Sequence, residues 1–574
     1  MLPHKVIEQR LRQAVSAVLP DADLTTVRVR PCPDPKFGDY QSSALMSLAK
    51  ARQRNPRELA SEVLGKLDLS ECCETVEIAG AGFLNFRLKT EALLDALQAT
   101  TLERLFFEKA ARSRTVVVDF SSPNTAKPMH VGHIRSTILG DTLARVLRLL
   151  GDRVITDNHV GDWGTQFGKL LVGWKHHLNR AALKQDPIAE MERLYKLVNG
   201  ASETDLAVLD AARQELVKLQ GGDEENLRIW REMIALSQSQ FDTIYRRLGL
   251  SFDYTLGESF YNLRLPSLVA ELVEKGIARQ SEGAIAVFFE EIPQLKDHPA
   301  LIQKSDGAFN YTTTDLATLE HRLKNWRPDE VVYVTDGRQQ LHFQQLFAIF
   351  RRWHPEASMR LAHVWFGSIL GEDGKPFKAR SGETIRLSDL LDEAEERALK
   401  VVSEKSPDLP EAQRREIARV VGLGAIKYAD LLPNRQSDYV FSWDKMLALT
   451  GNTAPYLQYA YARIRSIFRK GNVEESGATS HSKIRLEKEQ ELALAKHLLN
   501  FGIVLEAVAE EYRPNFLCNY LYDLAGHFTA FYENCPVLKA EPAQRASRLS
   551  LCNLTAAVLR QGLEVLGIET VEQM

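Results

Sequence analysis

The segment at residues 122–133 constrains this chain more than any other part of its sequence. It follows an apolar, strand-like run at residues 115–120 and precedes apolar residues at helical spacing that begin near His130. Pro123 and Asn124 mark a turn between the two elements. A helix that starts at the carboxyl end of a buried strand presents unpaired N–H groups and a positive dipole. The segment therefore predicts a strand, a turn and a helix N-terminus that binds phosphate.

Two histidines, His130 and His133, stand within this segment with two residues between them. At a helix start their imidazoles would lie near each other, and Gly132 would leave room for a flat group against the backbone. A zinc pair of the metalloprotease type has the spacing His-Glu-x-x-His. Here the spacing is three and no glutamate intervenes, so we expect no metal. Incidental structural histidines are an alternative, but Lys127 and Asn124 upstream favour nucleotide chemistry.

Composition sets few further limits. The chain has 574 residues, 44% hydrophobic and 26% charged, as in globular proteins of several domains. Its six cysteines show no C-x-x-C spacing and are too sparse for a disulfide scaffold, which favours free thiols in a reducing cytoplasm. No apolar run of about 18 residues occurs, so we expect no contact with a membrane. We expect a cytoplasmic monomer.

The net charge of -4 argues mildly against a nucleic-acid partner when it is considered alone. Phosphate contacts, however, need local rather than global positive charge. Residues 24–57 carry seven basic side chains against two acidic ones, and residues 445–473 carry five basic side chains and no acidic one. A solvated face explains each stretch equally well. Two basic stretches at opposite ends of the chain would nevertheless suit a large, bent ligand.

The order of the predicted elements divides the chain into three domains. Residues 1–112 predict a small α+β domain. Residues 113–440 alternate strands and helices, which indicates an α/β domain with a doubly wound, Rossmann-type parallel sheet. Within it, long charged helices at about 176–260 indicate a helical insertion. Residues 441–574 predict an all-α domain.

The segment at residues 122–133 resembles the first signature of the class I aminoacyl-tRNA synthetases, in the form carried by the arginyl-tRNA synthetase family. The resemblance implies that the N-terminal domain binds the elbow of a tRNA and that the helical C-terminal domain binds its anticodon. Other stretches similar to this family lie at residues 38–40, 161–168, 311–317, 377–382 and 454–460. The matching motif comprises Ser122, Pro123, Asn124, Thr125, Ala126, Lys127, Pro128, Met129, His130, Val131, Gly132 and His133.

The resemblance implies a reaction in two steps. The carboxylate of L-arginine attacks the α-phosphate of ATP, which enters with Mg²⁺, and the arginyl-adenylate then acylates a ribose hydroxyl of the terminal adenosine of tRNA(Arg). Such chemistry relies on positioning and charge stabilisation rather than on an enzyme nucleophile. The implied catalytic residues are His130, His133, Lys127, Lys378 and Arg380, and the implied ATP-binding residues are His130, Gly132, His133, His342 and Lys378.

The second signature of the class, usually Lys-Met-Ser-Lys-Ser, is altered in this chain. The corresponding residues 374–382 lack a plain second lysine. The arginyl family shows the same departure and places a lysine just before the first signature instead. Lys127 fits that description, with a solvated loop lysine as the alternative. Whether Lys378 or Arg380 faces the pyrophosphate is left open.

The amino acid site has a physical requirement of its own, because a planar guanidinium is best held by carboxylates. Asp119, at the end of the first strand, and Asp315 are the candidates, although Asp315 would also suit a helix cap. A site that hydrogen-bonds its substrate rejects analogues without editing, so the helical insertion need not be an editing domain. The implied arginine site comprises Asp119, Ser121, Asn124, Tyr311, Asp315 and Gln339.

The resemblance also implies contacts with tRNA, and a requirement for bound tRNA when arginine is activated. Two rival functions are another adenylate-forming or nucleotidyl-transferring enzyme of the same sheet type, and a non-catalytic tRNA-binding relative. The helical C-terminal third disfavours the first rival, and the intact signature residues disfavour the second. The implied tRNA contacts are Asp39, Tyr40 and Gln41 in the N-terminal domain and Tyr456 and Arg463 in the helical domain.

Overall fold

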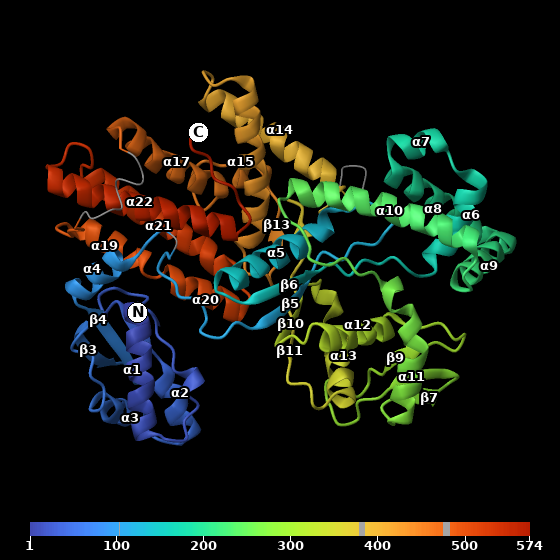
Figure 1. Ribbon diagram of the computed structural model, residues 1–574, viewed down its shortest axis with the longest axis horizontal. Coiled ribbons are helices and arrows are strands. Elements are labelled where there is room, and N and C mark those ends of the chain that lie inside the picture. Colours follow the sequence, from blue (N-terminus) through green and yellow to red (C-terminus); the bar gives the residue numbers. More distant parts are fainter. Residues whose placement is uncertain (103, 378–384, 474–482) are drawn as a thin grey trace.

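Figure 1 shows the computed structural model of the chain, which describes residues 1–574 except 103, 378–384 and 474–482. The N-terminal domain lies beneath the helical C-terminal domain on one side of the molecule. The central sheet lies between these two domains and two lobes that are inserted into the α/β domain, on the right of the view.

The N-terminal domain is built on an antiparallel sheet of order β1-β2-β4-β3. Its strands are β1 (Arg30–Pro31), β2 (Tyr40–Ser42), β3 (Cys73–Ala79) and β4 (Phe83–Leu88), and its helices are α1 (Pro3–Val18), α2 (Ala44–Ala51), α3 (Pro56–Leu64) and α4 (Thr90–Ala99). The apolar stripe of α1, with Ile7, Leu11 and Val15, is buried in the core, as helical spacing requires. The predicted α+β class of this domain is confirmed.

Four parallel strands form the central sheet, in the order β11-β10-β5-β6. They are β5 (Thr115–Asp119), β6 (Arg153–Asp157), β10 (Glu330–Tyr333) and β11 (Arg360–His363). Val116, Val117 and Val118 are fully buried, because a central parallel strand is covered on both faces. The winding direction reverses between β5 and β10. Doubly wound sheets bind ligands at this reversal, beyond the carboxyl ends of the strands.

The connection from β6 to β10 is long and holds two insertions. The helical insertion runs from Gln166 to Arg247, so it starts and ends earlier than the predicted range of 176–260. Its helices are α6 (Gln166–His177), α7 (Arg180–Gln185), α8 (Pro187–Thr204), α9 (Leu206–Gln220) and α10 (Glu224–Arg247). The sequence analysis did not predict the second insertion, because its strands are only three or four residues long. This insertion comprises η3 (Glu258–Arg264), α11 (Leu265–Glu274), β7 (Arg279–Ser281), β8 (Ala284–Val287) and β9 (Ala300–Gln303).

Three further helices surround the sheet: α5 (Ile134–Leu149), α12 (Tyr311–Asn325) and α13 (Gln340–Trp353). Two short strands, β12 (Ile369–Leu370) and β13 (Tyr439–Val440), pair in parallel. Between them lie two long helices, α14 (Leu387–Lys405) and α15 (Glu411–Leu431), in a part of the chain that the sequence predicts to alternate strands and helices. From residue 441 on, the described elements are helices, as predicted: α16 (Trp443–Met446), α17 (Ala454–Gly471), α19 (Glu489–Leu498), α20 (Phe501–Glu511), α21 (Asn515–Asn534) and α22 (Pro542–Val565).

One described segment, Glu489–Glu511, is long and apolar enough to cross a membrane by length and composition alone. It forms two helices, α19 and α20, rather than one. Their apolar residues Leu494, Leu498, Leu505 and Val508 are buried in the core of the C-terminal domain. Packing within this domain therefore accounts for the apolar composition of the segment.

Candidate active site

The turn after β5 has an unusual backbone. Ser121, Ser122 and Ala126 have φ angles of 71°, 47° and 59°, a left-handed conformation that costs a non-glycine residue about 1–3 kcal/mol. Hydrogen bonds hold this shape, since the Ser121 N–H donates to Oγ of Ser136 at 2.9 Å and the Ser122 N–H donates to Oδ1 of Asn158 at 3.0 Å. Contacts from α5 and from the segment after β6 therefore give the turn a single geometry.

His130 and His133 form a capping box at a short 3₁₀ turn, η2 (Val131–His133), which leads into α5. The Gly132 N–H donates to Nδ1 of His130, and the His130 N–H donates to Nδ1 of His133, both at 3.1 Å. An imidazole nitrogen that accepts a hydrogen bond carries no proton, so the proton of each neutral ring is on Nε2. The backbone thus makes both rings Nε2–H donors.

The two rings lie together as predicted, with centroids 4.0 Å apart. Burial lowers the pKa of His133 to about 3, and burial followed by the charge of Lys127 lowers the pKa of His130. Both rings are therefore neutral near pH 7. Gly132 is required here, because a Cβ would lie 2.8 Å from Cε1 of His130. The flat group against Gly132 is the His130 ring itself.

Lys127 lies just before the two histidines, and its positive charge contributes, after burial, to the lowered pKa of His130. Its Nζ is 5.4 Å from the ring centroid of Tyr195 in α8, a cation–π contact. Within the described residues the Lys127 ammonium thus contacts an aromatic ring, and its positive charge acts on His130.

Asp315 lies one turn inside α12, whose N-cap is Asn310. Its position within the helix shows that the helix-cap alternative is wrong. Oδ2 of Asp315 lies 2.6 Å from Nε2 of His342, and Oδ1 lies 3.8 Å from Nε2 of His159. Tyr311, on the preceding turn, meets His342 edge to face with centroids 4.8 Å apart. Asp315 therefore lies between two imidazoles beneath an exposed tyrosine.

Glu258 is a site residue that the sequence analysis did not identify. Burial raises the pKa of Glu258 to about 7, with the neighbouring His159 opposing this shift and the carboxylates of Asp315 and Asp162 adding to it. We call the group formed by Glu258, Asp315 and His159 the acidic pocket. Carboxylates that repel one another in a half-buried site fit a cationic ligand. No sequence spacing connects Glu258 with Asp315, and only the fold brings them together.

Asp119 does not face the acidic pocket. Its Oδ2 accepts a hydrogen bond from NH2 of Arg322 at 2.5 Å, and Arg322 also donates to Asp157 at 2.7 Å. Its Oδ1 accepts from Oγ of Ser122 at 3.1 Å, so Asp119 supports the signature turn. The guanidinium that pairs with Asp119 in this structure is therefore that of Arg322. Asp119 and the buried Ser121 thus contact other side chains of the protein, and their contact with arginine stays a prediction.

The remaining predicted residues vary in position. Asn124 and Gln339 are exposed, at the signature turn and at the start of α13 respectively. His342 contacts Asp315 beside the acidic pocket, and its binding to ATP stays a prediction. Lys378 and Arg380 lie outside the described residues.

The predicted tRNA contacts in the N-terminal domain need correction. Tyr40 is 1% exposed, and Oδ1 of Asp39 pairs with Nζ of Lys496 in α19 at 2.7 Å. The resemblance implied contacts with tRNA for these two side chains, whereas in the structure they stabilise the domain core and its contact with the helical domain. Partly exposed in the described structure are Gln41, Tyr456 and Arg463.

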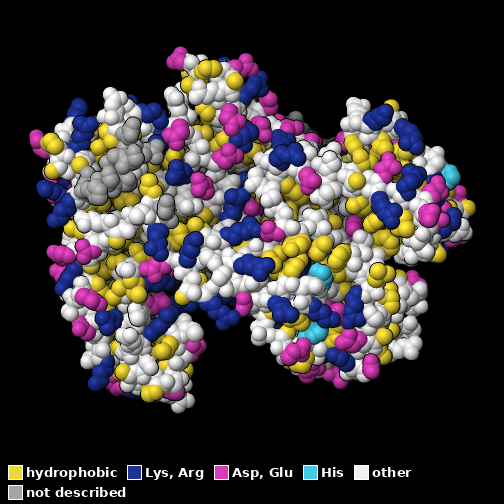
Figure 2. Space-filling view, in the orientation of Figure 1, with side chains coloured by type: hydrophobic (Ala, Val, Ile, Leu, Met, Phe, Trp, Pro, Cys, Tyr) yellow, Lys and Arg dark blue, Asp and Glu magenta, His cyan; other side chains and the backbone are white. Residues whose placement is uncertain are grey.

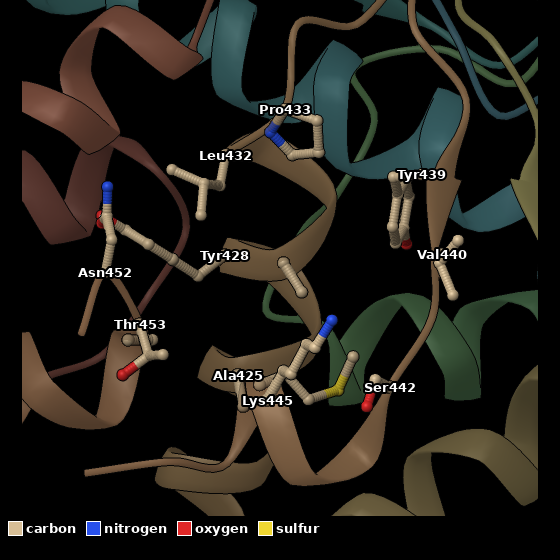
Figure 3. A pocket seen from close by; sticks show the side chains of 13 residues that line it. Ala425, Tyr428, Leu432, Pro433, Tyr439, Val440, Ser442, Lys445, Asn452 and Thr453 are labelled. Atoms are coloured by element: carbon tan, nitrogen blue, oxygen red, sulfur yellow. The ribbon is translucent and has the colours of Figure 1, made fainter. Parts of the chain in front are cut away.

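The cavity in Figure 3 is separate from this site. It has a volume of about 210 Å³ and lies between the end of α15, β13, α16 and the start of α17. The hydroxyl oxygen of Tyr428 lies 2.5 Å from Oδ1 of Asn452 and 2.8 Å from the carbonyl oxygen of Cys518, and its single hydrogen is shared between these two acceptors. Its lining contains no described residue of the signature or the acidic pocket. It is a gap between helices where the catalytic and C-terminal domains meet.

Three family descriptions match the chain. "Arginyl tRNA synthetase N terminal domain" matches residues 5–88, "tRNA synthetases class I (R), catalytic domain" matches residues 96–443, and "DALR anticodon binding domain" matches residues 457–574. Together with the parallel sheet and the histidine signature at its carboxyl edge, these matches define a class I aminoacyl-tRNA synthetase.

Similar proteins narrow this class. An arginine–tRNA ligase of Chromobacterium violaceum is 46% identical over 100% of both chains. The arginyl-tRNA synthetase structure from Plasmodium falciparum has a TM-score of 0.81 at 30% identity, covering 100% of this chain and 99% of that one. The structure from Thermus thermophilus has a TM-score of 0.85 at 28% identity, covering 100% of both. The chain belongs to the arginyl-tRNA synthetase family, which confirms the predicted resemblance, fold class and enzyme class.

Proposed function

We propose that this chain joins L-arginine to tRNA(Arg) through an arginyl-adenylate, with the signature turn and the acidic pocket as the two halves of its active site. The observation that supports this most is the pair of neutral imidazoles of His130 and His133, each made an Nε2–H donor by a backbone N–H group. The signature follows β5 and the acidic pocket surrounds α12, beside the reversal point of the sheet.

The phosphate half works by charge stabilisation. As the carboxylate of arginine attacks the α-phosphorus, a P–O bond forms, the bond to pyrophosphate breaks, and negative charge builds on the phosphate oxygens. The Nε2–H groups of His130 and His133 donate to these oxygens, and Lys127 adds a full positive charge. Donors that are already in place cost no reorganisation during the reaction. Mg²⁺ bound to the nucleotide would balance the charge of its phosphates.

The amino acid half recognises a cation. The guanidinium of arginine lies between the carboxylates of Asp315 and Glu258, which otherwise repel each other. Tyr311 covers this position from the first turn of α12, and Asn124 and Gln339 hold the amino and carboxylate end of the substrate. A neutral side chain would leave the half-buried Glu258 without a cationic partner, so it would be rejected.

An aminoacylation assay with twenty separate amino acids, ATP and total tRNA tests this function. Arginine alone should become attached to tRNA. Exchange of pyrophosphate into ATP that yields no aminoacylated tRNA would favour another adenylate-forming enzyme. The absence of both exchange and aminoacylation would favour a non-catalytic relative.

We also place the enzyme in the cytoplasm as a monomer, in line with its six free cysteines. Gel filtration tests the monomer.

Arginine-dependent pyrophosphate exchange should require tRNA. Tyr311 is 58% exposed in the free protein, so the acidic pocket is incompletely covered before tRNA binds. Binding of tRNA can favour the covered form of the acidic pocket over the open form only if tRNA binds the covered form more tightly. We expect tRNA to have this difference in affinity. Exchange should be measured with tRNA, without it, and with tRNA whose 3′ ribose has been oxidised so that it binds but cannot be charged. Substantial exchange without tRNA would contradict the expectation.

The Asp315→Asn variant should raise the KM for arginine roughly 10- to 150-fold, because a charge-assisted hydrogen bond is worth about 1.5–3 kcal/mol. The KM for ATP and the thermal midpoint should not change, since the substitution keeps the shape of the side chain and Asp315 caps no helix. Asp242→Asn, on the exposed face of α10, is the matched control. Normal arginine affinity in the Asp315 variant would remove this residue from the site.

Arginine affinity should depend on pH through Glu258, whose pKa is raised to about 7. Above pH 7 the carboxylate is ionised and pairs with the guanidinium, whereas below pH 7 it is protonated and the pair is lost. A single proton predicts a loss of about tenfold in affinity per pH unit below 7 and a plateau above pH 8. The arginine dissociation constant measured from pH 5.5 to 9 checks this. The Glu258→Gln variant should bind weakly and show a flat profile over this range.

A further inference from the structure

The helical insertion packs directly against the signature turn. Ala126 belongs to the apolar cluster of this insertion, together with Phe167 of α6 and Met191 of α8. The Ala126 N–H donates to Oγ of Ser237 in α10 at 2.9 Å, and Ser237 is itself fully buried. Ala126 has the left-handed φ of 59°. The insertion therefore helps to hold the strained residue that directly precedes Lys127.

Tyr195 connects the same apolar cluster to Lys127. The side chain of Tyr195 is partly buried and packs against this cluster, so the core of the insertion fixes the position of its ring. Nζ of Lys127 lies 5.4 Å from the centroid of the ring. A lysine side chain has a flexible stem with a charge at its end, and the negative face of an aromatic ring attracts such a charge. Tyr195 therefore limits the positions that the Lys127 ammonium can occupy.

A second contact joins α8 to the signature. The guanidinium of Arg386 pairs with Asp186, just before α8, and with Glu192 within it, each at 3.3 Å. Residues 385–387 in turn pair with residues 129–131 through two backbone hydrogen bonds, of 2.9 and 3.0 Å. The helix that carries the Tyr195 ring is thus also connected to the histidine end of the signature.

The lobe formed by the helical insertion has a mixed outer surface on the side that Figure 2 shows. Lysine and arginine side chains lie among aspartates and glutamates there. A nucleic acid is attracted by a surface of one sign of charge. The contacts with the signature turn are therefore the stronger indication of what this lobe does.

We propose that Tyr195 is a positioning residue for adenylate formation, which holds the Lys127 ammonium at the α-phosphate. This inference rests on the proposed function. A charge stabilises a transition state best when it is in place before the reaction, because no reorganisation is then needed. Without the ring, the ammonium would spend part of its time in water, away from the phosphate. Arginine binding should not depend on the ring, since the acidic pocket is built from other elements.

The test compares rates of pyrophosphate exchange at saturating tRNA, arginine and ATP. Tyr195→Leu keeps an apolar side chain but removes the ring, so this variant should be about 2- to 30-fold slower, the value of one cation–π contact. Its KM for arginine should not change. Tyr195→Phe keeps the ring and should keep the rate. Leu197→Ala, at an exposed apolar residue of the same helix, is the matched control.

Two further measurements distinguish positioning from a purely structural role of the ring. In the Lys127→Ala protein, Tyr195→Leu should cause no further slowing, because the charge that the ring holds is already absent. Phenylalanine with increasing fluorination in place of Tyr195 keeps a ring of similar size but weakens its negative face, so the rate should fall as fluorine atoms are added. The thermal midpoints of this fluorinated series should agree. If the leucine variant does not fold, the fluorinated series decides.

The outcomes separate this inference from the function on which it rests. Absence of arginine-dependent exchange in the unmodified protein would overturn the proposed function as well. The role of Tyr195 alone would be overturned by normal exchange in the leucine variant or by slow exchange in the Tyr195→Phe variant. Equal slowing with and without Lys127, or a rate that does not change with fluorination, would also overturn it, since the ring would then act on the fold and not on the charge.

Discussion

The His133→Asn variant should exchange pyrophosphate into ATP about 10²- to 10³-fold more slowly than the unmodified protein, the usual cost (~2.7–4 kcal/mol) of losing one donor to a transition state. The Oδ1 of asparagine occupies the position of Nδ1, so it still accepts the hydrogen bond that the His130 N–H makes in the present structure. Only the Nε2–H group is lost. Exchange measured with saturating tRNA, arginine and ATP, together with the thermal midpoint, checks this.

The His133→Gln variant is the matched control, because the amide of glutamine reaches the position of Nε2 but leaves the cap unmade. It should keep more activity than the asparagine variant and lose about 1 kcal/mol of stability, the usual value of a helix cap. A normal exchange rate in the asparagine variant would show that His133 is structural and does not touch the phosphates.

Lys127→Ala should slow exchange by at least ~10²-fold, because a fixed positive charge beside the α-phosphate is removed. Arginine affinity should be nearly unchanged, since the acidic pocket is built from η3, α12 and the segment after β6 rather than from the signature turn. Rapid-quench measurement of arginyl-adenylate formation, with arginine binding measured separately, checks both parts.

Two controls accompany the Lys127 variant. Lys184→Ala removes an exposed lysine from α7 of the helical insertion and should have no effect. Lys127→Arg keeps the charge and the contact with the Tyr195 ring, so it should recover part of the lost rate. An alanine variant with a near-normal rate would identify Lys127 as a solvated loop lysine.

The signature region could be predicted from the sequence because its structure is encoded locally. An apolar run long enough for a strand, a turn with Pro123, and apolar residues at helical spacing lie next to one another in the chain. The structure has β5, the turn and α5 in that order. The proximity of the two imidazoles followed for the same reason, since His130 and His133 are three residues apart at a helix start. The contact with tRNA that the resemblance implied for Tyr40 does not agree with the burial of this side chain, which depends on packing across the whole domain.

By itself, the sequence determined the family, the α/β class and the two histidines, since these depend on residues close together in the chain or on motifs. Only the tertiary structure decided which groups are free to bind a ligand. Asp119 and Arg322 are 203 positions apart in sequence, yet they form a buried ion pair that occupies the carboxylate assigned to arginine. Glu258 faces Asp315 only because η3 packs on α12. Charges are paired or left free by contacts across the fold, and spacing along the chain does not encode these contacts.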